Sequence, residues 1–287
     1  MALSLILFIG AAVVGYAIGY VGDSQTQQDR TANEKRAEEV EDRKEEPFTA
    51  TVEYDDSPPE VWKIVLDRTL TEAEQKRLSA FRVSEEARKY LTSLGGRTIR
   101  YTSLLNSDPM DLVPQAGGNS TVFKMNLFSK RDTQLSITDL KAVDVSCREP
   151  TAKAVIVFPP QGGAAYEGIL YNLAKPDLGP IITDEKYQGE HYFSRRKINL
   201  GGGESPGGLR VEAVTQRQSC TWELEAHYRD AYQNFGTVRL RHGDKPFYAE
   251  GIPARPQQLW YMNIGAQAGE DMWLSCGDDT EDPFCQS

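Results

Sequence analysis

The chain has 287 residues, of which 39% are hydrophobic and 26% charged, and its formal net charge at pH 7 is −10. The acidic balance disfavours nucleic acids as partners, because contacts with phosphates need a basic face. It also disfavours peripheral binding to anionic lipid headgroups, which would repel an acidic body.

The first 22 residues form an apolar run, and the first charged side chain is Asp23. Twenty helical residues rise about 30 Å, the thickness of the hydrocarbon core of a bilayer. We therefore expect residues 1–22 to be a transmembrane anchor in contact with the lipid bilayer. A cleavable signal peptide is the alternative, since Ala17 and Gly19 have the spacing of a cleavage site. The run is longer than the ~7–15 residues of a signal core and no Lys or Arg precedes it, so a retained anchor is favoured.

Small residues recur within this run at intervals of four, at Ala11, Gly15 and Gly19. This spacing lets two membrane helices approach closely and predicts a homodimer through the anchor. The alternative is that Gly and Ala are simply common in such segments.

The orientation of the anchor is contested by the sequence itself. Arg30, Lys35 and Arg36 follow the run, and the positive-inside rule would place them in the cytoplasm. They stand well behind the end of the run, after Asp23 and Asp29, and the cysteines described below favour an oxidising compartment. We expect a single-pass protein in the cell membrane with an extracytoplasmic body.

Residues 23–46 differ in composition, because acids and bases alternate and Val40 is the one β-branched apolar residue between Ser24 and Glu46. Pairs such as Arg30 with Glu34 have the i,i+4 spacing of helix-stabilising ion pairs. The absence of a heptad pattern argues against a coiled coil. The segment is predicted to be a charged stalk, helical or disordered, that holds the body away from the membrane.

The next segment, residues 47–118, is predicted to hold a strand at 60–66 and two short helices. Thr71 and Glu74 have the spacing of a capping box at the start of the first helix. The second helix is expected from Ser84 to Leu94, where Gly95 and Gly96 can end it. A loop is expected at 106–118.

From residue 119 to 252 the apolar residues repeatedly alternate with polar ones. Between Cys220 and Tyr228 the alternation places Trp222 inward and predicts it to be a core residue, with Glu223 and Glu225 facing solvent. Short strands at this spacing are typical of an antiparallel, immunoglobulin-like β-sandwich. The predicted strands are 123–127, 135–147, 152–158, 167–173, 191–200, 209–216, 220–228, 236–241 and 246–250. The fold class is therefore mainly β.

The C-terminal extension, residues 253–287, is rich in aromatic residues and ends in an acidic tail. We expect it to pack on the sandwich. The alternative is that Trp260, Tyr261 and Trp273 form an exposed platform on which a sugar or another small molecule stacks.

Four cysteines, Cys147, Cys220, Cys276 and Cys285, allow three disulfide pairings. Cys147 ends one predicted strand and Cys220 begins another, so a bridge between them would staple the sandwich. Cys276 and Cys285 would then close a short C-terminal loop. An even number of cysteines behind an export segment fits an oxidising compartment.

No catalytic, cofactor or metal motif is found in the sequence. The histidines, His191, His227 and His242, lie far apart, and there is no Cys-x-x-Cys pair. The glycine-rich stretch at 201–208 lacks the Lys and Ser or Thr of a phosphate-binding loop, and no Gly-x-Ser-x-Gly elbow occurs. We expect no cofactor and no metal.

Four strand-rich stretches resemble a group of uncharacterised membrane-anchored actinobacterial proteins: Trp62–Arg68, Leu135–Cys147, Cys220–Tyr228 and Lys245–Phe247. The resemblance covers roughly residues 60–250. It implies an extracytoplasmic β-sandwich and no assigned activity.

Three functions remain open. The favoured one is a non-enzymatic interaction or structural module on the cell surface, since anchor, stalk and sandwich follow one another without a catalytic motif. The others are a protein that binds a small molecule or glycan, and a hydrolase of the cell envelope.

Overall fold

The structure is a computed structural model, and it describes residues 30–34, 36–37, 39–42, 44–54, 62–101, 119–158, 168–184, 186–204, 207–215, 217–267, 270–277 and 285. The predicted anchor at 1–22, with its alternative cleavage site and its small-residue stripe, lies outside these ranges, and so does the loop predicted at 106–118. Among the described helices, none is long and apolar enough to span a bilayer.

The described chain is mainly β and forms two sheets. Sheet A has the strand order β15 (Trp273–Ser275), β14 (Gln258–Met262), β6 (Ala154–Phe158), β2 (Trp62–Leu66), β3 (Arg97–Tyr101), β4 (Asn119–Phe128), β10 (Gly207–Val214), β7 (Ile169–Asn172) and β8 (Ile181–Ile182), and β1 (Thr49–Tyr54) also pairs with β4. Sheet B has the order β12 (Phe235–Leu240), β11 (Ser219–Asp230), β5 (Leu135–Arg148) and β9 (Ile198–Leu200), and β13 (Phe247–Ala249) also pairs with β11.

One half of sheet A packs face to face on sheet B and forms the sandwich. Alternate residues of β4 and β11 point into a shared core, where Phe123 and Trp222 are fully buried. The rings of Trp222 and Phe247 lie 5.2 Å apart, and so do those of Trp222 and Tyr171. The prediction that Trp222 is a core residue is confirmed.

The other half of sheet A forms a second unit, the α/β lobe, with helices α2 (Glu72–Ala80) and α3 (Ser84–Ser93) on one face. The predicted capping box is present, since Thr71 accepts from the amide of Glu74 and the Glu74 carboxylate accepts from the amide of Thr71. Leu78 and Leu91 of the helices are fully buried against strand residues such as Ile64.

We had expected the C-terminal extension to pack on the sandwich. It packs in the α/β lobe instead. Strand β14 pairs with β6, and Trp260 and Trp273 enter the core under the two helices. The physical reason is that the apolar faces of α2 and α3 need a sheet to cover them. Strands β2 and β3 supply only part of it, and β6, β14 and β15 supply the rest.

Two segment boundaries of the sequence analysis also differ from the structure. Strand β1, within the segment 47–118, belongs to the sandwich because it pairs with β4 from Thr49↔Phe128 to Tyr54↔Phe123. Strand β6, within the segment 119–252, belongs to the α/β lobe. The strand predicted at 191–200 is a short helix, α4 (Tyr192–Arg195), followed by β9, and the turn η1 (Pro176–Leu178) lies upstream.

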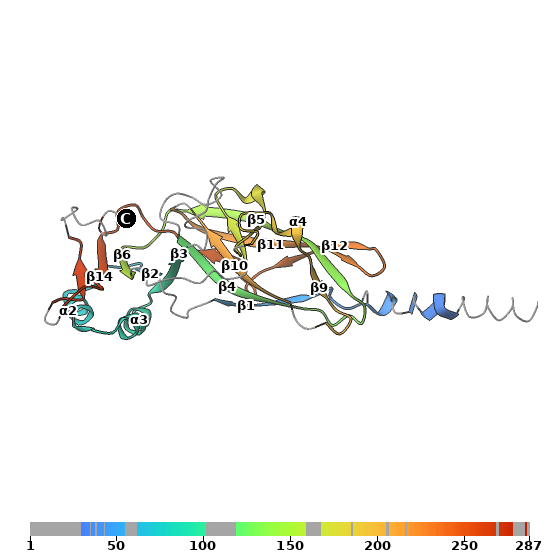
Figure 1. The fold of residues 1–287 in the computed structure, drawn as a ribbon, viewed down its shortest axis with the longest axis horizontal. Coiled ribbons are helices and arrows are strands. Elements are labelled where there is room, and N and C mark those ends of the chain that lie inside the picture. The colour runs from blue at the N-terminus through green and yellow to red at the C-terminus, as the bar shows by residue number, and fades with distance from the viewer. Residues whose placement is uncertain are drawn as a thin grey trace, which may run out of the picture.

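Figure 1 shows an elongated molecule with the α/β lobe at one end of its long axis. Residues 30–34, 36–37 and 39–42 are helical and leave the sandwich at the opposite end. We call them the stalk helix. The sandwich strands run roughly along the same axis, so the three parts follow one another in a line.

Candidate interaction site

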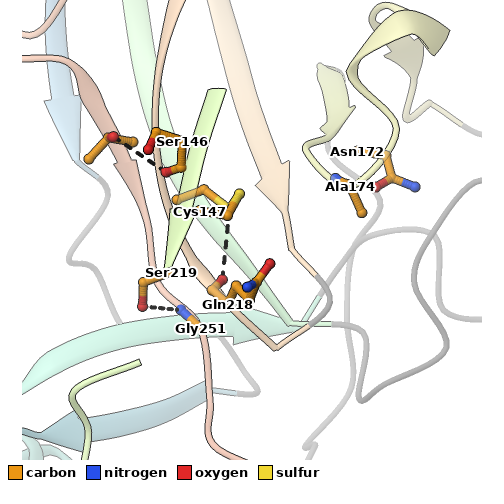
Figure 2. Close-up of a disulfide and its surroundings, with 9 residues drawn as sticks. Ser146, Cys147, Asn172, Ala174, Gln218, Ser219 and Gly251 are labelled. Atoms are coloured by element: carbon orange, nitrogen blue, oxygen red, sulfur yellow. Dashed lines mark hydrogen bonds between the residues drawn. A yellow bond between two sulfur atoms is a disulfide. The ribbon is translucent and has the colours of Figure 1, made fainter. Parts of the chain in front are cut away.

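Both predicted disulfides are present. Cys147 and Cys220 face each other across β5 and β11 with their Cα atoms 4.1 Å apart, and Cys276 is bonded to Cys285. We had expected the first bond to hold the sandwich together. It links two neighbouring strands of sheet B and does not bridge the two sheets. It lies where β5 and β13 leave sheet B toward the α/β lobe, close to Ser219 and Gly251 (Figure 2).

The predicted aromatic platform is not formed. Trp260 is 6% exposed and Trp273 is 1% exposed, and both pack in the core under α2 and α3. Tyr261 is half-buried on the other face of the same sheet. The alternative that these three residues form an exposed stacking surface is therefore wrong, and the favoured interpretation, that the aromatics are packed, holds for both tryptophans, because α2 and α3 cover the strand face that carries them.

The outer face of sheet B carries a network of ion pairs. Glu223 contacts Arg241 at 2.7 Å, Glu225 contacts Arg239 at 3.2 Å, and the Nε2 atom of His227 lies 3.0 Å from Glu225. Only 10% of the Glu223 side chain is exposed, because the two arginines lie over it. Across the described ranges, no three His, Cys, Asp or Glu side chains are grouped so that they could hold a metal ion.

A second polar network joins the α/β lobe to the sandwich. Arg97, at the start of β3, donates two hydrogen bonds of 2.7 and 2.8 Å to Asp67, and its Nε and Nη2 also contact Glu250. Glu250 directly follows β13, and its carboxylate accepts from Ser219 and Tyr248, each at 3.2 Å. These contacts engage both charged groups, so the network joins the two units.

The charges of this network shift the pKa values of its members. Hydrogen bonding to Arg97 lowers the pKa of Asp67 to about 2, since it stabilises the ionised carboxylate. Burial raises the pKa of Tyr248, and the nearby Glu250 acts in the same direction. The hydroxyl of Tyr248 donates a hydrogen bond to Glu250.

The stalk helix is docked on the sandwich at its C-terminal end. Asp42 is 6% exposed, and its carboxylate accepts from the amide of Asp132 at 3.2 Å and from the hydroxyl of Thr133. Glu39 accepts from the side chain of Asn234 at 3.5 Å, in the turn between β11 and β12. We call these contacts, together with those of Arg131 and Ser129 below, the stalk joint.

Arg131 is the buried centre of the stalk joint. Its guanidinium donates to the carbonyl oxygen of Glu45 at 3.1 Å and lies 4.0 Å from the carboxylate of Asp230. Ser129 donates to the carbonyl oxygen of Pro47 at 2.6 Å. Because backbone carbonyls on both sides of residue 46 are held, the chain enters β1 in one fixed direction.

Immediately beyond the stalk joint, a groove runs between strands β1 and β12. It has a volume of about 870 Å³, part of it open solvent. Residues 46–50 form one wall and residues 237–241 form the other. The floor is apolar, with Phe48 and Leu240 buried and Ala50 and Val238 half-buried. We call it the edge groove.

Both walls of the edge groove are sheet edges. In the described part of the chain, β1 pairs with β4 alone and β12 pairs with β11 alone. Farther along β1, Tyr54 links the two sheets, since its hydroxyl accepts from the amide of Tyr248 at 3.1 Å. Below the groove, the buried ring of Phe48 meets Tyr228 of β11 edge to face, with ring centroids 6.0 Å apart. The groove is therefore a short, two-sided opening onto the sandwich core.

The sequence analysis missed this groove because it missed β1. The signal was available, since Thr49–Tyr54 alternates polar and apolar residues and contains β-branched side chains. The stalk joint carried no comparable signal, because Asp42 and Arg131 are far apart in sequence and are ordinary charged residues in composition.

Comparisons with known proteins add no relative: no protein-family model, no curated protein and no solved structure matches the chain.

Proposed function

We propose that this protein is a single-pass, membrane-anchored extracytoplasmic module that offers its body to a partner and performs no catalysis itself. The proposal includes an immunoglobulin-like character for the sandwich and membership of the actinobacterial group that the sequence resembles. Residues 1–22 serve as the anchor in this proposal, and residues 23–46 serve as the stalk.

The compartment is supported by the two disulfides. Disulfides persist in oxidising surroundings outside the cytoplasm, and all four cysteines of the chain are paired. This outweighs the charge count at Arg30, Lys35 and Arg36, which favours the opposite orientation.

The observation that carries the proposal is the stalk joint. A flexible spacer needs no buried contacts with the body, yet Asp42 and Arg131 are almost fully buried where the stalk helix meets the sandwich. The stalk helix leaves along the long axis, opposite the α/β lobe (Figure 1). An anchored protein built in this way holds its sandwich upright and its α/β lobe farthest from the bilayer, which suits presentation to a partner.

Labelling of intact cells with a membrane-impermeant, amine-reactive reagent tests the topology. We expect modification of Lys141 and Lys245, which are exposed on the body, before lysis. N-terminal sequencing of the same material should start at the beginning of the chain. Modification only after lysis, in cells stripped of their wall, would contradict the orientation, and a mature N-terminus near Tyr20 would contradict the anchor.

One observation favours a second function, the binding of a glycan. Phe235 is 71% exposed and borders a hollow on the outer face of sheet B, with Arg229 stacked on its ring at 4.2 Å. Aromatic rings beside hydrogen-bonding side chains such as Ser136 can receive a sugar. If so, Phe235→Ala would abolish binding to a panel of envelope oligosaccharides, whereas Phe128→Ala, which removes an exposed ring on sheet A, would not.

A further inference from the structure

We propose that the edge groove binds an extended segment of a partner protein, which pairs with β12 as an added strand of sheet B. The segment has apolar side chains at alternate positions, which enter the groove, and a carboxylate that meets Arg241. This inference rests on the proposed function for where the partner is met and for the shared membrane that disfavours a second copy as the occupant. The groove itself is a property of the folded sandwich.

The first argument is the backbone of β12. An edge strand presents a row of amide and carbonyl groups that can pair with another chain. Natural edge strands are protected by charged side chains, lysine above all, by a proline or by a bulge. Strand β12 reads Phe-Gly-Thr-Val-Arg-Leu and pairs with β11 in continuous register from Phe235 to Leu240, so it has no lysine, proline or bulge, and its one charged side chain, Arg239, is engaged by carboxylates of its own sheet. Strand addition at an open edge is an established mode of peptide recognition.

The second argument is the apolar floor. Ala50 and Val238 point toward the sandwich core, but they are only half-buried because none of the described strands lies between the two edges. A segment paired with β12 would send every second side chain toward these residues. Small or β-branched apolar side chains would complete the core at this opening and remove apolar surface from water.

The third argument is charge. Arg239 of β12 and Arg241, which directly follows β12, stand on the rim of the groove, and their side chains are 44% and 49% exposed. Arg239 already contacts Asp144, Glu223 and Glu225, whereas the described ion pair of Arg241 is with Glu223 alone. A guanidinium has five N–H donors, so Arg241 has capacity for a second carboxylate.

A second copy of this chain fits the groove less well than a foreign segment. Its own β12 would bring Arg239 and Arg241 against the same pair of arginines. An antiparallel pair of β12 strands, which run roughly along the stalk axis, would also send the two stalks in opposite directions (Figure 1). Two copies in one membrane could not pair in that way.

The test uses the full chain in lipid nanodiscs and a synthetic probe peptide. The probe alternates valine with threonine and carries a glutamate at each end, so that either strand direction brings a carboxylate near Arg241. We expect measurable binding, and we expect the probe to slow hydrogen exchange of the β12 amides. The matched control is β9, which pairs only with β5 among the described strands and whose exchange should not change.

Two modified probes separate strand addition from nonspecific apolar contact. A peptide methylated on the backbone nitrogens that face β12 has the same side chains but no donors, and its binding should be about tenfold weaker or lost. A peptide with lysine in place of glutamate should bind about fivefold more weakly. The Arg241→Gln variant should lose this preference. Lys141→Gln, which removes the same charge from the outer face of β5, should keep it.

Equal binding of the methylated peptide would overturn the proposal, and so would protection that falls on β9 or elsewhere instead of β12. If the Arg241→Gln variant still prefers the glutamate probe, the part of the proposal that pairs a partner carboxylate with Arg241 is wrong. The nanodisc assay does not depend on which side of a cell membrane the body occupies. Failure of the topology experiment therefore contradicts the proposed function alone, and failure of the probe contradicts the groove alone.

Discussion

Arg97 of the α/β lobe and Glu250 of the segment that leaves the sandwich are joined by two hydrogen-bonding contacts, and only 3% of the Glu250 side chain is exposed. Strand β3 carries the arginine and the end of β13 carries the carboxylate, so this pair ties together the two units that share sheet A. The nearby hydrogen bond from the amide of Gly251 to Ser219, at 3.0 Å, fixes the same crossing (Figure 2).

Removal of the buried carboxylate should weaken this junction strongly. We expect Glu250→Ala to lower the free energy of unfolding by about 3–5 kcal/mol, because Arg97, Ser219 and Tyr248 lose their common acceptor. Chemical denaturation measures the effect. Asp144→Ala is the control, since its carboxylate is 66% exposed although it also pairs with an arginine. Similar losses of unfolding free energy in both variants would show that burial of the carboxylate does not determine how much an ion pair stabilises the fold.

Acid should destabilise the α/β lobe through two carboxylates. Hydrogen bonding to Arg97 lowers the pKa of Asp67 to about 2, and hydrogen bonding to Arg68 lowers the pKa of Glu74 to about 2. Both folded pKa values lie below the unfolded ones, so the stabilisation is complete above the unfolded pKa of about 4. It is lost as the pH falls from there through about 2. Both groups are near the surface, so salt reduces the effect.

Urea denaturation at a series of pH values between about 5 and 2 checks this expectation. The midpoint should fall across that range in the wild-type chain. The fall should be shallower in the double variant Asp67→Asn and Glu74→Gln. A wild-type midpoint that rises as the pH drops would contradict the sign.

The two disulfides should differ in their contribution to stability. Replacing Cys147 and Cys220 with serine opens a link between residues 73 apart, and the chain-entropy estimate for such a loop is about 4 kcal/mol. The link from Cys276 to Cys285 spans 9 residues, and its estimate is nearer ~2.5 kcal/mol. Thermal unfolding of the two double-serine variants gives the order. A larger loss for the C-terminal link would mean that strain or residual structure outweighs loop length.

The sandwich core should be sensitive at Trp222. Trp222→Ala removes a fully buried ring packed on Phe247 and Tyr171, and we expect a loss of about 3–5 kcal/mol. The sequence alone predicts that Glu223→Ala and Glu225→Ala are nearly silent. Because Glu223 lies under Arg239 and Arg241, we now expect about 1 kcal/mol for Glu223→Ala and less for Glu225→Ala. Denaturation of the three variants checks this order, and a silent Trp222→Ala would contradict the packing.

The stalk joint should hold the stalk helix against proteolysis. Asp42→Ala removes the acceptor of Thr133 and of the Asp132 amide, and we expect trypsin to cleave at Arg36 about tenfold faster. Glu41→Ala is the matched control, because its carboxylate is exposed and contacts only Lys44 among the described residues. Equal cleavage rates of the two variants would show that the Asp42 contacts do not hold the stalk helix on the sandwich.

Local patterns in the sequence were sufficient for many elements. Thr71 and Glu74 identified the start of α2, Gly95 marked the end of α3, and the alternation from Cys220 to Tyr228 identified β11 with Trp222 inside. These signals are local, since capping and the period of two depend on residues within a few positions of one another. The pairing of Cys147 with Cys220 followed because both stand at strand ends.

What the sequence determined by itself was thus the class of the fold, its capped helices, its clearest strand and its disulfides. Only the tertiary structure decided which unit each strand joined. The aromatics of β14 and β15 were expected to pack on the sandwich, and Trp260 and Trp273 instead became core of the α/β lobe because α2 and α3 cover that face. The tertiary structure also placed Asp42 and Arg131 together in the stalk joint, and it made β1 and β12 the two walls of the edge groove. These roles depend on contacts between residues far apart in the chain, and such contacts form only when the two sheets pack and leave two of their edges open.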